Sequence, residues 1–362
     1  FLGVGMLFGL NFISFRSVEM TQFVGMIALC IILFTGGMDT SFQEIKPIIG
    51  PGVVLATVGV VMTAMVLAGF VWLVAPWLDL EISFALALLL AATMSSTDSA
   101  SVFSILRSKK QGLKQHLRPL LELESGSNDP MAYMLTILLI GVVTNSQGGG
   151  GLGMSALYFV VQLVVGTLSG YLIGRLAVWT INKINLANHS LYSVLLLAFI
   201  FFAFAFTDLV KGNGYLAVYL AGLVVGNHKL AQKRSLTVFF DGFTWLMQIV
   251  MFLTLGLFVN SDELLRPEVL ILGGAVGAFM ILVARPVTVF ACLLLLLTVF
   301  PKRQTVTQRE AKARTNFFAS RAFRLLFFSI LLYVGLENGI SYFAESLSRM
   351  FGKKQLPEDT TE

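Results

Sequence analysis

The stretch PIIGPGVVLATVGVVMTAMVLAGFVWLVAPWL, residues 47–78, decides the fold, because it carries no charged side chain over its whole length. A membrane-spanning helix needs about 20 mostly apolar residues. Further charge-free runs cover Pro130 to Gly174, Ile184 to Thr207 and Gly242 to Ser261. Charged residues make up 12% of the chain, whereas a soluble domain is roughly a quarter charged. We therefore predict an all-α polytopic membrane protein.

The apolar pattern predicts one transmembrane domain over residues 1–337 with about 10–11 spans, followed by a short polar tail over residues 338–362. The chain begins inside an apolar segment without a charged leader region, so we expect its first span to be incomplete. The predicted spans cover residues 1–15, 21–38, 47–76, 84–106, 119–143, 153–182, 190–208, 212–227, 237–260, 268–300 and 316–337.

Basic residues orient the predicted spans, because lysine and arginine gather in cytoplasmic loops. The strongest basic loop runs over residues 107–118, and we place it on the inside. Alternation then puts the glycine-rich loop Asn145 to Gly153 on the outside. The net charge of +5 arises in such loops and does not indicate nucleic-acid binding. The two cysteines, Cys30 and Cys292, lie in apolar runs and indicate packing rather than a disulfide or a metal site.

The segment ESGSNDP, Glu124 to Pro130, places acids inside a predicted span. A charged side chain at the centre of a bilayer costs roughly 2.5–3.5 kcal/mol on insertion scales. At about 1.5 Å per residue, Asp129 lies roughly 15 Å from the inner end of its span, near the midplane. Intramembrane acids of this kind mark ion or proton pathways. Glu122 lies closer than Glu124 to the inner end of the predicted span. We expect it to lie at the start of the helix and to face the inner membrane interface.

The preceding span carries the hydroxyl-rich stretch TMSSTDSAS, Thr93 to Ser101. Hydroxyl side chains compete for backbone groups, so this stretch is a poor helix former. Asp98 lies at a depth similar to that of Asp129. Two adjacent spans thus bring acids and hydroxyls together at mid-membrane, as in the discontinuous helices of secondary transporters. Asp98 fits either a helix cap or a direct ion contact.

Arg285, followed by Pro286, is the third polar element and lies deep in the apolar segment from Glu268 to Pro301. A cation at this depth needs a counter-ion, and Glu124 is the natural candidate. A tight turn at Arg285 would split the segment into two spans that are too short, so we discount it.

A buried carboxylate can hold a proton near neutral pH, and the same group, when ionised, can bind a cation. We expect Asp129 to be this shared site, for which the proton and the cation compete. Alternating access would then turn this competition into exchange of the cation for the proton across the membrane. The neighbouring Asn128 cannot titrate, which favours one proton per cation and electroneutral exchange.

Thr97-Asp98, Glu124 to Pro130 and Ala284-Arg285-Pro286 resemble the motifs of the monovalent cation:proton antiporter-1 family, in particular its bacterial NhaP-type sodium or potassium/proton antiporters. The resemblance runs from about Phe1 to Pro301. It implies a multi-pass protein of the bacterial inner membrane that works as a homodimer, needs no cofactor, and has two crossed discontinuous helices.

The resemblance also implies roles for single residues. Asp129 would bind the cation or proton, and Ser125 and Thr97 would supply oxygen ligands. Asn128 would hold Asp98 at the helix crossing. Glu124 would belong to the cation/proton-binding residues and would pair with Arg285.

The region over residues 302–337 departs from the pattern of the family. The family usually carries Gly-Leu-Arg-Gly-Ala there, whereas this chain has Asn316 to Arg324, in which Arg321 takes the arginine position. A last span and a cytosolic domain that the family usually has are expected to be lacking.

Two other functional classes fit parts of the pattern. A cation channel would need a continuous polar pore, whereas these charges cluster at one depth. A non-transporting cation sensor would bind cations without flux. An intramembrane enzyme fits less well, because no histidine lies at midplane depth. Oxygen ligands suit both sodium and potassium; the resemblance leans toward potassium.

Overall fold

The computed structural model describes the polypeptide in ranges that together cover most of the first 299 residues. These ranges are residues 1–11, 17–78, 80–99, 102–103, 117–144, 152–186, 188, 190–259, 264 and 266–299. The predicted span 316–337 and the tail 338–362 lie outside the described residues.

Helices make up the described part of the chain, and they match the predicted spans closely. The longer elements are α1 (Leu2–Asn11), α2 (Val18–Asp39), α5 (Val60–Val74), α6 (Phe84–Met94), α8 (Leu117–Thr144), α9 (Leu152–Lys183), α10 (Leu191–Leu209), α11 (Gly214–Gly226), α12 (Lys233–Phe258), α14 (Pro267–Phe279) and α15 (Arg285–Val299). The shorter elements are α3 (Phe42–Ile45), η1 (Lys46–Ile48), α4 (Ile49–Val54), η2 (Leu55–Gly59), η3 (Ala75–Leu78) and η4 (Met280–Ala284). The all-α prediction is confirmed.

Seven helical segments of the described residues are long and apolar enough to cross a membrane. One of them joins α3 to η3 into a single segment, Phe42–Leu78, and this segment contains the charge-free stretch from which the fold was predicted. Two shorter apolar helices, α6 and α11, add to these seven. Large apolar side chains such as Trp72, Leu172 and Leu246 are exposed on the outside, as expected for a surface that lies in lipid.

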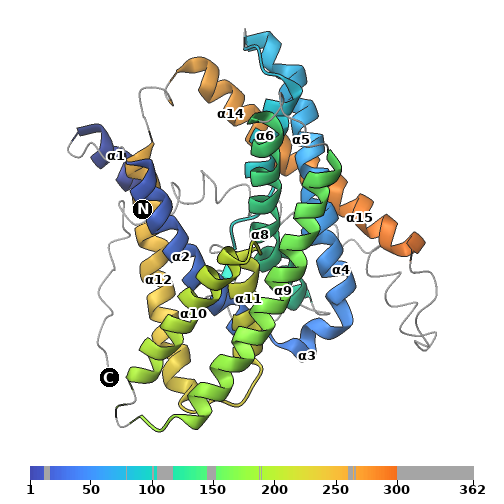
Figure 1. Cartoon of the computed structure of the whole chain (residues 1–362). Coiled ribbons are helices and arrows are strands. Elements are labelled where there is room, and N and C mark those ends of the chain that lie inside the picture. The colour runs from blue at the N-terminus through green and yellow to red at the C-terminus, as the bar shows by residue number, and fades with distance from the viewer. Residues whose placement is uncertain are drawn as a thin grey trace, which may run out of the picture.

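The helices form two groups, which Figure 1 shows side by side. In the first group α11 packs against α2, α9 and α10, while α12 packs against α1 and α2. In the second group α5 packs against α6, and the segment α14–η4–α15 crosses both η2 and α5. Helix α8 contacts α6 and α4 on one side and α9 and α11 on the other, so it joins the two groups.

Each helix group has its own buried core. In the first group, Phe34, Tyr219 and Phe240 are among the largest fully buried side chains. The second group is built from smaller residues, since alanines of α5 and α6 pack against Leu139 and Val276. The small side chains bring α5 and α6 close together, which is how helices associate in lipid.

Two spanning segments of the second group contain a π-helical turn, η2 and η4. The helix continues from η4 directly into Arg285 and Pro286, so the tight turn that we discounted is absent there. The two segments are also joined by a buried contact at 3.1 Å between the hydroxyl oxygens of Thr63 and Thr288. Single π-helical turns inside longer helices occur frequently at functional sites.

Candidate cation site

Helix α6 ends where the hydroxyl-rich stretch begins. Residues 95–98 leave the helical conformation, and α-helical bonding resumes where the Val102 N–H donates to the Asp98 carbonyl at 3.1 Å. Thr93 and Ser95 each donate their hydroxyl to a carbonyl of the preceding turn, at 2.7 Å. Hydroxyls bonded in this way compete with helix propagation. The predicted interruption of this span is therefore confirmed.

Helix α8 stays helical through the whole segment from Glu124 to Pro130. One face of α8 packs against the interruption after α6. This face carries Ser125 and Asn128, which are both fully buried, and Asp129, which is half-buried. Gly126 faces α11, where a side chain at this position would lie 2.4 Å from the Tyr219 ring. The glycine thus lets α8 lie against both helix groups at once.

Asp129 is held by two serines of the interruption. The Ser96 hydroxyl donates to Oδ1 of the carboxylate, and the Ser99 hydroxyl donates to Oδ2. Ser99 is fully buried, with 1% of its surface exposed. Each carboxylate oxygen of Asp129 therefore contacts a serine hydroxyl. The single hydrogen of Ser96 has two other acceptors within reach, Asn128 Oδ1 at 3.1 Å and the Thr97 carbonyl at 3.2 Å.

Asn128 connects the other polar residues of the two segments. Its amide nitrogen donates to Thr97 Oγ1 at 2.6 Å and to Glu124 Oε1 at 3.1 Å. Thr97 Oγ1 also lies 3.4 Å from Ser125 Oγ. These two donations use both hydrogens of the Asn128 amide. The structure thus brings the two predicted oxygen ligands, Thr97 and Ser125, next to each other.

Asp98 lies at the start of the helical piece after the interruption, because its carbonyl accepts the first α-helical bond of that piece. This is the backbone position of a helix cap. Its side chain is exposed, whereas the amide hydrogens of Asn128 go to Thr97 and Glu124.

Arg285 completes the cluster from α15. Its Nη1 atom lies 3.2 Å from Glu124 Oε1, and the two side chains are 15% and 13% exposed. Its Nη2 atom donates to the Ser95 carbonyl at 2.8 Å, directly after the end of α6. The ion pair between Glu124 and Arg285 that the sequence suggested is present. Arg285 also neutralises the carbonyl end of the interrupted helix.

Glu122, another residue named from the sequence, lies apart from this cluster. Arg321 falls outside the described residues. Glu122 lies in the second turn of α8, where it accepts a hydrogen bond from Arg118 Nε at 2.8 Å. It is therefore bound within its own helix, near the start of α8.

Three contributors to the cluster were not singled out from the sequence: Ser96, Ser99 and Asn213. The two serines were visible only as members of a hydroxyl-rich stretch. Asn213, at the start of α11, donates from Nδ2 to the Pro130 carbonyl at 3.0 Å and accepts from the Leu216 N–H at 3.0 Å. It ties the outer part of the acidic segment to the first helix group.

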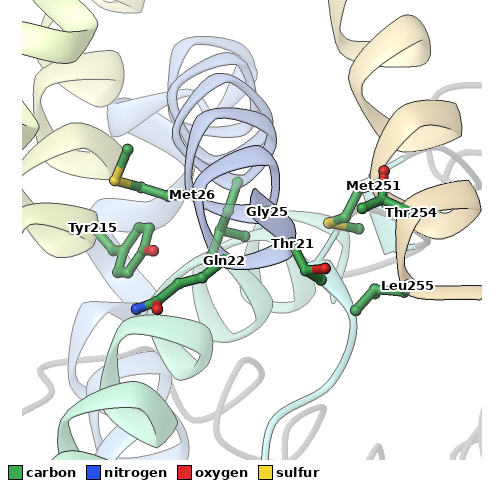
Figure 2. A pocket seen from close by; sticks show the side chains of 9 residues that line it. Thr21, Gln22, Gly25, Met26, Tyr215, Met251, Thr254 and Leu255 are labelled. Atoms are coloured by element: carbon green, nitrogen blue, oxygen red, sulfur yellow. The ribbon is translucent and has the colours of Figure 1, made fainter. Parts of the chain in front are cut away.

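A cavity of about 220 Å³ lies away from this cluster, between α2, α11 and α12. Figure 2 shows Gln22 and Met26 of α2 facing Tyr215 of α11 across it. Tyr215 also packs edge-on against Tyr133 of α8, with ring centroids 5.0 Å apart. Tyr133 lies one helical turn after Asp129 on α8.

The cluster can offer oxygen atoms from a carboxylate and from hydroxyl groups, the kind of ligands that hard cations require. These oxygen atoms come from the unwound segment after α6 and from α8, the helix that faces it. Thr97 of the segment and Ser125 of the helix are one example. Unwound segments with this composition hold coupling ions in secondary transporters. A carboxylate in such a place can hold either a proton or a cation.

Comparison with protein families gives a match over most of the chain. Residues 1–341 match the family described as "Sodium/hydrogen exchanger, transmembrane". A K(+)/H(+) antiporter NhaP from Alkalimonas amylolytica is 41% identical over 298 residues, which are 81% of this chain and 50% of that protein. A K(+)/H(+) antiporter NhaP2 from Shewanella baltica is 36% identical over 297 residues, with the same coverage. The chain thus spans about half the length of these relatives.

More distant relatives extend the likeness to sodium exchangers and to a solved fold. A Na(+)/H(+) antiporter NhaP from Pseudomonas aeruginosa is 25% identical over 338 residues, covering 91% of this chain and 72% of that protein. The solved structure of the sodium proton antiporter MjNhaP1 from Methanocaldococcus jannaschii at pH 8 superposes with a TM-score of 0.66 at 20% identity. That superposition covers 81% of this chain and 72% of the other, and it shows a shared fold.

Proposed function

The chain belongs to the sodium/hydrogen exchanger family, and from this membership and the site we propose that it exchanges a monovalent cation for protons at Asp129. Potassium is the cation we propose first, because the 41% and 36% identical relatives are named K(+)/H(+) antiporters. The observation that carries the proposal is the Asp129 carboxylate, held by hydroxyl groups between an interrupted helix and a continuous one.

Asp129 would bind the cation and the proton in turn, with Ser125 and Thr97 as further oxygen ligands. Glu124 already has a cationic partner in Arg285, so in this mechanism its role is structural. Asn128 links Glu124 to Thr97 and carries no titrating proton. A site with one exchanging acid carries one proton against one monovalent cation, and the exchange would be electroneutral.

Alternating access would come from movement between the two helix groups. Helix α8 carries Asp129 and lies between the groups, so a shift of the second group against the first would turn the site from one side of the membrane to the other. We propose the bacterial plasma membrane as the location and a homodimer as the assembly, as the relationship to the family suggests.

Flux measurements in proteoliposomes test this proposal. A potassium gradient should drive saturable proton movement by the chain, and Asp129→Asn should abolish it while the variant still inserts and folds. An imposed membrane potential should leave the exchange rate unchanged if one proton moves per cation. Full cation-dependent proton flux in the Asp129→Asn variant would refute the role of Asp129, and non-saturable flux would favour a channel.

A further inference from the structure

Two buried aromatic rings connect the first helix group to the two segments that carry the site. Tyr219 of α11 lies against Gly126 of α8, where a Cβ atom would come within 2.4 Å of the ring. Phe103, in the helical piece after the interruption, lies against Gly36 of α2, where a Cβ atom would come within 2.3 Å of the ring. The two rings are 1% and 3% exposed, so each one fills the space that its glycine leaves.

Both contacts lie between Asp129 and the side of the membrane that carries the basic loop over residues 107–118. Gly126, which holds the Tyr219 ring, is nearer than Asp129 to the start of α8, and α8 begins at the end of this loop. Phe103 follows the interruption and precedes the same loop. The two rings therefore lie on the predicted inner side of Asp129.

The stripe of α8 that Tyr219 covers carries an acid on either side of the ring. Glu122, Gly126 and Asp129 follow one another at helical spacing, so they share one face of the helix. Glu122 is buried, with 6% of its surface exposed, and lies one turn before the glycine. Buried acids at membrane depth mark ion pathways. On this stripe the aromatic ring occupies the position between the two acids.

The backbone of Tyr219 and its ring have different neighbours. A Cβ atom at Gly37 of α2 would lie 2.3 Å from the Tyr219 carbonyl oxygen, so the backbone is held within the first helix group. The ring reaches out of this group to α8. Its hydroxyl lies near Thr40 and Ser127, but it is in hydrogen-bond geometry with no residue of the described part of the chain. Packing against Gly126 therefore holds the ring on α8, and the ring can leave without breaking a hydrogen bond.

We propose that Tyr219 and Phe103 form an aromatic gate that closes the route between Asp129 and the side of the basic loop. Both rings leave their glycines when the site opens to that side. A shift of the site-bearing segments against the first helix group separates both pairs at once, because each pair joins the same two parts of the molecule. The two aromatics are positioning residues, since they control access to Asp129 without contacting it. This inference rests on the proposed exchange at Asp129.

Labelling of Ser99→Cys with a membrane-impermeant maleimide, applied to each side of membrane vesicles in turn, tests the gate. Ser99 is buried beside Asp129, so a thiol there reacts only when the site is open to the reagent. Addition of Tyr219→Ala or Phe103→Ala should make labelling from the side of the basic loop at least about tenfold faster, because loss of a buried ring lowers the cost of local opening. Labelling from the other side should keep its rate.

Further variants in the Ser99→Cys background separate a gate from a merely structural ring. Tyr219→Phe keeps the ring and should label as slowly as Ser99→Cys alone. Phe240 is equally buried in the same core, but it lies on α12, which packs against α1 and α2. Phe240→Ala should therefore lower the apparent Tm without faster labelling. If Tyr219→Ala does not fold, Tyr219→Leu, which removes the ring but keeps an apolar side chain, must speed labelling from the same side.

Labelling and flux separate the gate from the function on which it rests. If the unaltered protein exchanges potassium for protons but the alanine variants label no faster than Ser99→Cys alone, the gate is overturned and the proposed function stands. Faster labelling from the opposite side alone would overturn the gate as well. If labelling changes as expected but the unaltered protein shows no potassium-dependent proton flux, the gate is supported and the proposed function fails.

Discussion

The contact of α11 with α2 and the contact of α8 with the interruption after α6 are built in opposite ways. At the first, glycines bring two backbones together: a Cβ atom at Gly222 would lie 2.2 Å from the Phe34 carbonyl oxygen, and one at Gly37 would lie 2.3 Å from the Tyr219 carbonyl oxygen. At the second, polar side chains of the interruption meet polar side chains of a helix, as Ser99 meets Asp129.

The difference shows which contact can change and which cannot. Helices in lipid gain little from burying apolar surface, so they associate by close packing of small residues. The α11–α2 contact is of this kind and has no room for a side chain at Gly37 or Gly222. Polar groups at membrane depth are costly, and the contact of α8 with the interruption after α6 holds them together through hydrogen bonds that can exchange partners. The first contact suits a scaffold and the second suits a site that binds and releases ions.

Gly222→Ala should have the largest effect on folding, because the added methyl group would meet backbone atoms that cannot turn away. Overpacking typically costs about 1–3 kcal/mol and occasionally more, and we expect the upper end of this range or beyond because the obstacle is backbone. We expect a large drop in the yield of monodisperse protein and in the apparent Tm in detergent.

Gly69→Ala in α5 is the matched control, because nothing lies within 4 Å of a Cβ atom at that position. Exchange of a helical glycine for alanine there should stabilise the helix by about 0.5–1 kcal/mol. An equal yield and an equal apparent Tm of the two variants would show that the α11–α2 contact can accommodate a side chain at Gly222.

Glu124→Gln should have the next largest effect, because it removes the carboxylate that pairs with Arg285. Loss of one partner from a buried ion pair costs about 3–5 kcal/mol, since the other charge is left unpaired, and we expect a smaller cost for this pair because it is only partly buried. The apparent Tm should fall clearly, and cation-dependent proton flux should fall with it.

The double variant Glu124→Gln with Arg285→Gln should recover part of the lost stability, because neither residue then carries an unpaired charge. Stability losses that simply add in the double variant would mean that the two residues act independently, against the pairing of Glu124 with Arg285.

Asn213→Ala should have the smallest of the three effects. It removes the side chain that caps α11 and also reaches the Pro130 carbonyl, and loss of such a cap costs about 1–2 kcal/mol. Asn213→Ser keeps a capping oxygen but is too short for the second contact, so it should lose only about 1 kcal/mol. Thermal denaturation in detergent compares the two variants. Equal losses would mean that the link to Pro130 contributes nothing.

Most of the fold could be predicted from the sequence because membrane helices are marked by the absence of charge. The predicted span 190–208 differs by one residue at each end from α10. The interruption after Met94 was predicted as well, because hydroxyl groups compete locally for backbone carbonyls. The pairing of Glu124 with Arg285 was predictable because a deep cation needs an anion at the same depth.

The sequence could not separate the serines of the interruption from one another. Ser95 and Ser96 are neighbours, yet one binds its own helix and the other binds Asp129. Which hydroxyl faces α8 depends on the path of four residues without helical conformation, and side-chain periodicity gives no information there. Asn213 was missed for a related reason, since its capping role is visible locally but its contact with Pro130 joins segments far apart in the sequence.

The π-helical turn η4 has a consequence for how this chain tolerates changes in length. A π-helical turn holds one residue more than the α-helical turn it replaces, so the segment Met280–Ala284 stores an extra residue without rotating α15 about its axis. Deletion of one residue there would restore a regular helix and leave Arg285 facing Glu124. The same deletion within α14 would rotate Arg285 by about 100° and separate the pair. We therefore expect natural insertions and deletions in this segment to occur at η4, next to the Glu124–Arg285 pair, and not within α14.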